Sequence, residues 1–247
     1  ADAAALAALS TERLAEALQH GPGNPLSGLA ARAALLRRLG EVAAARPDLF
    51  GAPARLGHLY DHWLPRRDDL PAPDMLRLIL RALGPIWPGR IALAGTPLGD
   101  CGRHAAVEGD GLVPFHKLSQ WLVYSLVEPL AEAGFRIVDI DGLTGLAEYR
   151  NGGLFLDCGV IAPRDESLRQ RVLDPFSEPV VEWRALTITL LDRLAERVQA
   201  RLGLGAREFP LARMLEGGSW AAGRDIARER RPDGSAPLAI ASDGTLF

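Results

Sequence analysis

The sequence predicts a mainly α-helical protein, a single helical domain with a few short β-strands. Three observations predict this fold class. Leucine recurs at helical spacing in the opening segment, at Leu6, Leu9, Leu14 and Leu18. Two longer stretches, 115–134 and 181–202, keep an apolar side at the same spacing over several turns. Alternation with a period of two, which is typical of strands, is confined to short runs such as FRIVDI at 135–140.

The N-terminal half is expected to hold three helices separated by breaks. The first covers about residues 3–18 and stops at the Gly-Pro-Gly-Asn-Pro run 21–25. The second follows through Leu29 to Leu39, and the third follows Asp74, which suits the N-cap position. Prolines between them break the chain into short pieces, and the stretch from Gly84 to Gly111 is expected to be irregular.

The C-terminal half is expected to hold the longest helix, 181–202, which ends at Gly203. A further helical region covers 211–231, and its Gly217-Gly218 pair should bend or interrupt it. The run PLAIAS at 237–242 is predicted to be a short strand. No internal repeat or clear linker divides the chain, so residues 1–247 are expected to form one domain.

Composition excludes several classes of protein. Apolar residues make up 48% and charged residues 24%, a balance typical of globular proteins. The formal net charge of −3 gives no basic footprint, so no nucleic-acid partner is expected. Apolar runs are too short to cross a membrane, so no membrane partner is expected either. Two cysteines form no disulfide framework and favour a reducing compartment, most simply the cytoplasm.

The first candidate cluster lies at the start of the 115–134 helix, in FHKLSQW. His116 and Gln120 share a helix face, and Lys117 and Gln120 are neighbours at i and i+3. A helix start offers free N–H groups and the positive end of the dipole, which suit a phosphate. The alternative is an exposed helix start with a solvated Lys117 and with His116 packed against Trp121.

The second candidate cluster is the tetrapeptide Glu148-Tyr149-Arg150-Asn151, which runs through two glycines into an apolar stretch. Carboxylates accept hydrogen bonds from hydroxyls, and an Asn amide both donates and accepts, so the group could bind ribose. Gly152 and Gly153 would let a ligand or another backbone approach closely. The alternative is an ion pair between Glu148 and Arg150 that only closes a loop.

Weaker candidates occur elsewhere in the sequence. EPVVEWRALT places Glu182, Trp183 and Arg184 at a helix start, where an acid in the first turn is an ordinary dipole arrangement and the simpler interpretation. Glu216, Trp220 and Arg224 in LEGGSWAAGRD resemble the lining of a pocket more than a surface helix. The C-terminal SDGTLF contains Asp243 in a turn signal. The GDCGRH run around His104 has no third metal ligand at a recognised spacing, so no metal site is expected.

Five motifs in order resemble the uracil-catabolism protein 4 family of bacteria and fungi. They are HKLSQWLVYSLVEPL, LTGLAEYRNGGLFLDCGV, VEWRALT, LEGGSWAAGR and SDGTLF, and the resemblance covers about Pro25 to Phe247. Members of that family are longer at the N-terminus. The resemblance therefore implies that this chain is the C-terminal part of a longer protein, or that a second chain supplies the N-terminal region.

A fainter resemblance connects the chain with the queuosine-nucleotide glycosylase family. That family has a helix with Lys-x-x-Gln and, later, Leu-Thr-x-x-x-Asp-Tyr-Arg. The matching residues here are Lys117 with Gln120, and the segment 143–150, in which Glu148 replaces the Asp. The Val-Pro-Gln that usually follows is replaced by 151–153, Asn-Gly-Gly. This resemblance implies a glycosylase-like helical architecture.

Together the two resemblances imply an N-glycosidase that cleaves the ribose–nitrogen bond of a ribosyl-urea or related nucleotide in uracil catabolism. Glu148 is the implied catalytic carboxylate, with Glu216 and Asp243 as further candidates for the acid. The substrate-binding candidates are the side chains around them: His116, Lys117, Gln120, Tyr149, Arg150, Asn151, Arg184, Trp220 and Arg224.

Within this set Lys117 and His116 are expected to take the phosphate, and Gln120 the leaving urea. No metal or organic cofactor is expected. Two alternatives remain open at this point. One is a metal- or Cys-dependent hydrolase of a ureide or amide C–N bond, and the other is a non-catalytic ligand-binding subunit of a uracil-degrading complex.

Overall fold

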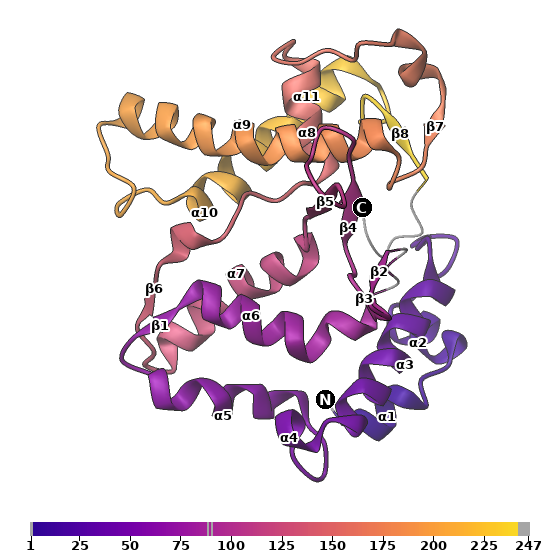
Figure 1. Ribbon diagram of the computed structural model, residues 1–247. Coiled ribbons are helices and arrows are strands. Elements are labelled where there is room, and N and C mark those ends of the chain that lie inside the picture. Colours follow the sequence, from indigo (N-terminus) through magenta and orange to yellow (C-terminus); the bar gives the residue numbers. More distant parts are fainter. Residues whose placement is uncertain (1, 88, 90, 242–247) are drawn as a thin grey trace. The chain divides into compact units, whose positions relative to one another are not determined.

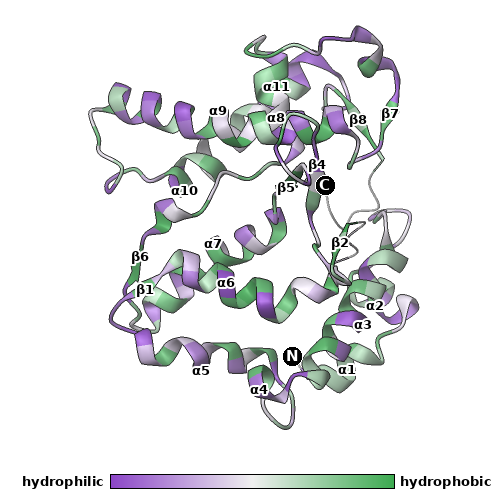
Figure 2. Ribbon diagram, in the orientation of Figure 1, coloured by the Kyte–Doolittle hydropathy of each residue, from purple (hydrophilic) through white to green (hydrophobic). Residues whose placement is uncertain are grey.

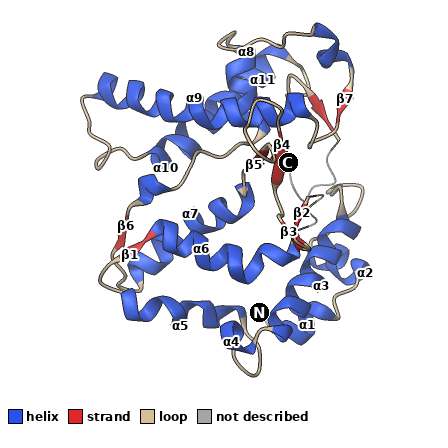
Figure 3. Cartoon of the chain, in the orientation of Figure 1, coloured by secondary structure: helices blue, strands red, loops and turns tan. Residues whose placement is uncertain are grey.

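Helices dominate the chain, and the prediction of a mainly α fold with short strands is confirmed (Figure 3). The computed structural model describes residues 2–87, 89 and 91–241, with the side chain of Glu216 outside this description. The described residues form two compact units. One takes in residues 2–100 and 125–138, and the other 101–124 and 139–241. Helix α7 (Lys117–Glu132) gives its first half to the second unit and its second half to the first.

The first unit is built from helices of different lengths with two small pairs of strands (Figure 1). β1 pairs with β6 in parallel, and β2 pairs with β3 in an antiparallel hairpin. Besides the second half of α7, the helices and strands of this unit are α1 (Ala3–Ala7), α2 (Thr11–Ala17), α3 (Leu29–Ala45), α4 (Pro47–Phe50), α5 (Leu59–Trp63), α6 (Ala72–Leu83), β1 (Leu70–Pro71), β2 (Ala92–Leu93), β3 (Thr96–Pro97) and β6 (Ile137–Val138).

Two details of the first unit correct the sequence analysis. The opening segment forms two helices instead of one, because the Ser10 side chain accepts from the Arg13 N–H and starts α2. Helix α6 begins at Ala72, so Asp74 lies in its first turn and not at the N-cap. Asp74 there pairs with the guanidinium groups of Arg66 and Arg77.

The second unit packs helices around α9, the longest of the described helices, together with two strand pairs. β4 pairs with β5 antiparallel, and β7 pairs with β8 in parallel. Its elements, besides the first half of α7, are β4 (Cys101–Arg103), β5 (Leu112–Pro114), α8 (Tyr149–Asp157), β7 (Val172–Leu173), α9 (Glu178–Leu202), α10 (Leu211–Met214), a π-helix (Leu215–Trp220), α11 (Ala221–Arg230) and β8 (Ala239–Ile240).

Helix α9 supplies the core of the second unit. Hydrophobic and hydrophilic residues alternate by turns along it (Figure 2), because its buried residues recur every three or four positions. Val180, Trp183 and Leu191 are among these buried residues. The helix ends at Gly203, whose φ of 67° is the left-handed conformation that favours glycine after a helix, as predicted.

The π-helix Leu215–Trp220 occupies the place of the predicted interruption at Gly217-Gly218. Helix α8 has no counterpart in the sequence analysis, which assigned no regular element to residues 149–157. Within the described part of the chain, no helix is both long enough and apolar enough to cross a membrane.

Candidate functional site

Helix α8 begins at Glu148, whose side chain closes the helix end. Its Oε2 accepts from the Arg150 N–H at 2.8 Å, and its Oε1 accepts from the Asn151 N–H at 2.5 Å. The backbone at Glu148 is extended, with φ of −120°, as an N-cap residue requires. Each carboxylate oxygen uses one of its two lone pairs for the cap, so each keeps a further acceptor position.

Burial and the neighbouring polar and charged groups shift the pKa of the Glu148 carboxyl in opposite directions. Burial raises the pKa of the Glu148 carboxyl above its ordinary value, because loss of water penalises the charged form. The N–H groups of Arg150 and Asn151 and the positive charges of Lys117 and Arg150 act in the other direction, but the net pKa stays raised. A carboxyl whose pKa is shifted by burial and by nearby charges is a candidate for a functional site.

The segment before the cap, residues 143–148, is held by helix α7. The Gln120 amide oxygen accepts from the Thr144 N–H at 2.8 Å, and its Nε2 donates to the Thr144 Oγ1 at 2.6 Å and to the Phe115 carbonyl at 3.3 Å. One turn later, the Tyr124 hydroxyl donates to the Thr144 carbonyl at 3.0 Å. Burial raises the pKa of that phenol.

The end of the same segment is held from α9 and α8. The Arg184 Nε donates to the Ala147 carbonyl at 3.3 Å, and its guanidinium lies 3.9 Å from the centre of the Phe115 ring. Arg184 is buried, so the cation–π contact with Phe115 stabilises the positive charge of its guanidinium inside the unit. The Asn151 Nδ2 donates to the Leu146 carbonyl at 3.2 Å.

Asn151 ties α8 to the π-helix. Its side chain is 1% exposed, and its Oδ1 accepts from the Ser219 hydroxyl at 2.8 Å. Next to it, Gly152 lies against α9. A Cβ at Gly152 would come within 2.8 Å of the Trp183 Nε1 and of the Thr187 Oγ1. The Trp183 indole N–H donates to the Gly152 carbonyl at 3.1 Å.

Close approach also joins α8 to α11. A Cβ at Gly223 would overlap the Arg150 carbonyl oxygen, and a Cβ at Gly153 would lie 3.1 Å from the Pro237 ring. The glycines after the polar tetrapeptide therefore let neighbouring helices and the C-terminal loop approach the backbone of α8. Gly152 and Gly153 were expected to let a ligand or another backbone approach closely, and atoms of Trp183, Thr187 and Pro237 occupy the space beside them.

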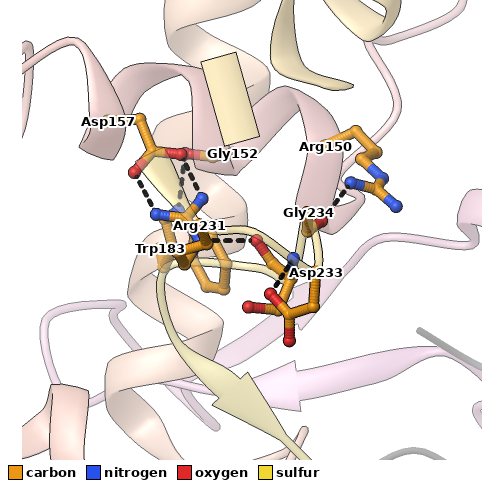
Figure 4. A network of polar contacts seen from close by, with 8 residues as sticks. Arg150, Gly152, Asp157, Trp183, Arg231, Asp233 and Gly234 are labelled. Atoms are coloured by element: carbon orange, nitrogen blue, oxygen red, sulfur yellow. Dashed lines mark hydrogen bonds and ion pairs between the residues drawn. The ribbon is translucent and has the colours of Figure 1, made fainter. Parts of the chain in front are cut away.

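The Arg150 side chain reaches the loop after α11 at Gly234 (Figure 4). Its Nη1 donates to the Gly234 carbonyl at 2.8 Å, and its guanidinium lies 4.6 Å from the centre of the Tyr149 ring. Two of the four residues of the polar tetrapeptide thus contact each other. The alternative interpretation joined Glu148 and Arg150 by an ion pair. In the structure, the Glu148 carboxylate accepts a hydrogen bond from the Arg150 N–H, and the charge of the Arg150 guanidinium partly offsets the rise that burial causes in the pKa of that carboxyl.

The same loop is fixed at the other end of α8 (Figure 4). Arg231 donates to both oxygens of Asp157, at 2.8 and 2.5 Å, and its Nε donates to the Ser235 carbonyl at 2.7 Å. The Asp157 side chain is 6% exposed. Such a bidentate ion pair fixes both the distance between the guanidinium and the carboxylate and their relative orientation.

Two comparisons with known proteins bear on this chain. The model of the family described as "Protein of unknown function (DUF1688)" matches residues 1–247. The chain belongs to the DUF1688 family. It is 42% identical over its whole length to Protein urg3 of Schizosaccharomyces pombe, and 37% identical over 98% of its length to Uracil catabolism protein 4 of Lachancea kluyveri. It spans 61% and 62% of the length of these two relatives.

Several residues of this DUF1688 chain that were predicted to bind a substrate form hydrogen bonds or ring contacts with other residues of the protein. Gln120 and Asn151 use both ends of their amides within the second unit, and Arg184 contacts a carbonyl and a ring. Lys117 is 6% exposed, and its charge acts on Glu148. Their predicted contacts with a substrate stay predictions.

Fewer contacts are described for the remaining candidate residues. His116 adopts a left-handed backbone, with φ of 47°, immediately before α7, a strained conformation that is often found at functional sites. Arg224 stacks on Trp220 at 4.7 Å. Asp243 and the Glu216 side chain fall outside the described residues.

The sequence analysis missed Thr144, Tyr124, Ser219 and the pair Asp157–Arg231. The Leu-Thr of the fainter resemblance was the available signal for Thr144, since its partner Gln120 belongs to the same pattern. In the part of the chain that is described, no three His, Cys, Asp or Glu side chains form a group that could hold a metal ion. Cys101 is buried, and Cys158 is exposed at the end of α8.

Proposed function

We propose that this DUF1688 chain is an N-glycosidase that hydrolyses the ribose–nitrogen bond of a ribosyl-urea or a related pyrimidine-derived ribonucleotide. The observation that carries the proposal is Glu148, a carboxylate that caps α8, has a pKa raised by burial, and is acted on by the charges of Lys117 and Arg150. The name of the relative from Lachancea kluyveri, Uracil catabolism protein 4, supports a role in pyrimidine catabolism. Opening the ring of a pyrimidine nucleotide and removing its C4–C6 fragment leaves the N1–C2–N3 atoms on ribose as a ureido group, which gives the substrate class.

The reaction needs few groups. The bond between C1′ and the ureido nitrogen breaks with its electron pair moving to nitrogen, and positive charge develops on the ribose ring. The Glu148 carboxylate would stabilise that charge and take a proton from the attacking water, whose oxygen bonds to C1′. A general acid, for which Glu216 and Asp243 are the candidates, gives a proton to the leaving nitrogen, which departs as urea. The proton that Glu148 took from water returns to that acid through solvent, so one water is consumed for each bond broken.

The cations suit the rest of the substrate. Arg150 offers a planar group with several donors, the usual partner of a phosphate, and Lys117 adds a second charge. Both also favour the ionised form of Glu148, which the charge on the ribose requires. A raised pKa brings the carboxylate closer to working pH, where a general base is more effective.

The test is hydrolysis of synthetic ribosyl-urea 5-phosphate by the purified protein and by Glu148→Gln. The expected result is turnover by the unmodified protein and a loss of at least about 100-fold in Glu148→Gln, the range of general-base catalysis. Glu148→Asp keeps a charged N-cap but shortens the reach by one methylene, so it should also lose rate. Asp165→Asn, which removes an exposed capping carboxylate elsewhere in the unit, is the matched control and should retain full rate.

A ligand-binding subunit is the second candidate, because both Glu148 oxygens already hold the start of α8. Binding of ribosyl-urea 5-phosphate, measured by calorimetry without any turnover, would favour this candidate over the glycosidase. Release of ammonia in place of urea would instead favour a ureide C–N hydrolase.

A further inference from the structure

Residues 143–148 have no regular secondary structure, yet side chains bond their backbone at several places. Thr144 is bonded at its N–H, its carbonyl and its hydroxyl. Further along, the carbonyls of Leu146 and Ala147 accept from Asn151 and Arg184. A connecting segment usually relies on water or turns for these groups. Here the protein fixes the path of the chain that leads to Glu148.

Gln120 makes the largest share of these bonds. Both ends of its amide are used, with the oxygen on the Thr144 N–H and the nitrogen on the Thr144 Oγ1 and the Phe115 carbonyl. Its side chain is 6% exposed. An amide committed in this way has little capacity left for a substrate, although the sequence analysis gave it the leaving urea.

We propose that Gln120 is a positioning residue, which acts through Thr144 to hold the segment 143–148 and so fixes the direction of the Glu148 carboxylate. The kinetic part of this inference rests on the proposed function. The physical reason is that truncating Gln120 leaves the Thr144 N–H without its acceptor and removes the bond from the amide nitrogen to the Thr144 hydroxyl, which then only donates to the Gly145 carbonyl. An unpaired group in a partly buried place is costly, so the segment moves until water or another group replaces the amide.

Kinetics of Gln120→Ala separate positioning from direct contact with substrate. Displacement of a catalytic group by about 1 Å costs on the order of 100-fold in rate, so kcat should fall by about 10- to 100-fold with little change in KM. Thr144→Ser keeps the hydroxyl and should retain the rate, whereas Thr144→Val should lose part of it. Gln199→Ala, which removes another Gln that donates to a backbone carbonyl in the same unit, is the control and should leave kcat unchanged.

The double variant decides whether the two residues act as one device. If Gln120 acts through Thr144, Gln120→Ala combined with Thr144→Val should be little worse than Gln120→Ala alone, because neighbours in one network are not additive. Additive losses, or a raised KM with unchanged kcat in Gln120→Ala, would show substrate contact and overturn the inference.

A second readout needs no turnover, so it keeps this inference apart from the proposed function. The pKa of the Glu148 carboxyl is measured by ¹³C NMR titration in the unmodified protein and in Gln120→Ala. The charged groups that act on it are Lys117 from α7 and Arg150 from α8, and both remain. A loosened segment admits water, so the raised pKa should fall toward its ordinary value. An unchanged pKa would overturn positioning even if the protein had no glycosidase activity.

Discussion

At the scale of single residues, Glu148 combines a structural and a chemical property. It starts helix α8 with both carboxylate oxygens, and burial nevertheless raises its pKa. A cap made by a partly buried acid stabilises the helix through charge-assisted bonds, while the same burial disfavours the charge. The residue is therefore held in place by its own helix and is sensitive to pH.

The raised pKa predicts how Glu148 affects stability with pH. Because the folded protein binds this proton more tightly than the unfolded chain, the contribution of Glu148 to stability is greatest below its unfolded pKa. It decreases as pH rises from about 4.5 through the folded pKa. The free energy of unfolding of the unmodified protein minus that of Glu148→Gln should therefore fall across this window. Urea denaturation at several pH values measures it, and a difference that rises with pH would contradict the raised pKa.

The polar tetrapeptide shows how far single residues can be predicted from sequence. Its position at the edge of a core follows from the apolar residues after it, and Asn151 and Phe155 are indeed buried. The partners of Asn151 and Arg150 could not be predicted, because Ser219 and Gly234 lie 68 and 84 positions away in the chain. Spacing within a motif carries no information about partners so distant.

At the scale of elements, helix α8 depends on small residues in its neighbours. Gly223→Ala on α11 would push a methyl group into the Arg150 carbonyl and should destabilise the protein by about 1–3 kcal/mol, the usual cost of overpacking. Gly217→Ala in the π-helix has open space around its Cβ and is the control. It should change stability by less than about 1 kcal/mol, since Ala is the better helix residue. Equal effects in thermal unfolding would contradict the packing described for α8.

The pair Asp157–Arg231 anchors the C-terminal end of the same helix. Asp157→Asn removes the charge and one acceptor from a pair whose carboxylate is nearly buried. It should cost about 2–3 kcal/mol, somewhat below the value for fully buried pairs because Arg231 keeps some exposure. Glu166→Gln breaks the exposed pair with Arg169 and should cost less than about 1 kcal/mol. Chemical denaturation of both variants compares them, and a cost no larger for Asp157→Asn would contradict the anchoring role.

The elements themselves were predictable where a period persists. Helices α3, α6, α7 and α9 carry apolar residues over several turns, and the sequence analysis found each of them. Helix α8 was missed because two glycines follow its polar first turn, and glycine is unfavourable inside a helix. The strands of two or three residues are too short to give a pattern, so only β6 and β8 were expected.

At the scale of the whole molecule, the candidate site belongs to the second unit, although its residues come from two stretches of chain. Phe115, Lys117 and Gln120 come from 101–124, and Thr144, Glu148 and Arg184 come from 139–241. The sequence gives no signal for this division, because α7 continues without a break across residues 124 and 125. The site could therefore be predicted as motifs but not as one assembly.

The proposed glycosidase would break the ribose–nitrogen bond with the Glu148 carboxylate. The most direct measurement is the amount of urea and of ribose 5-phosphate released from ribosyl-urea 5-phosphate by the unmodified protein and by Glu148→Gln. We expect equal amounts of the two products from the unmodified protein and almost none from Glu148→Gln. Ammonia without urea, or product from Glu148→Gln at the unmodified rate, would contradict the proposal.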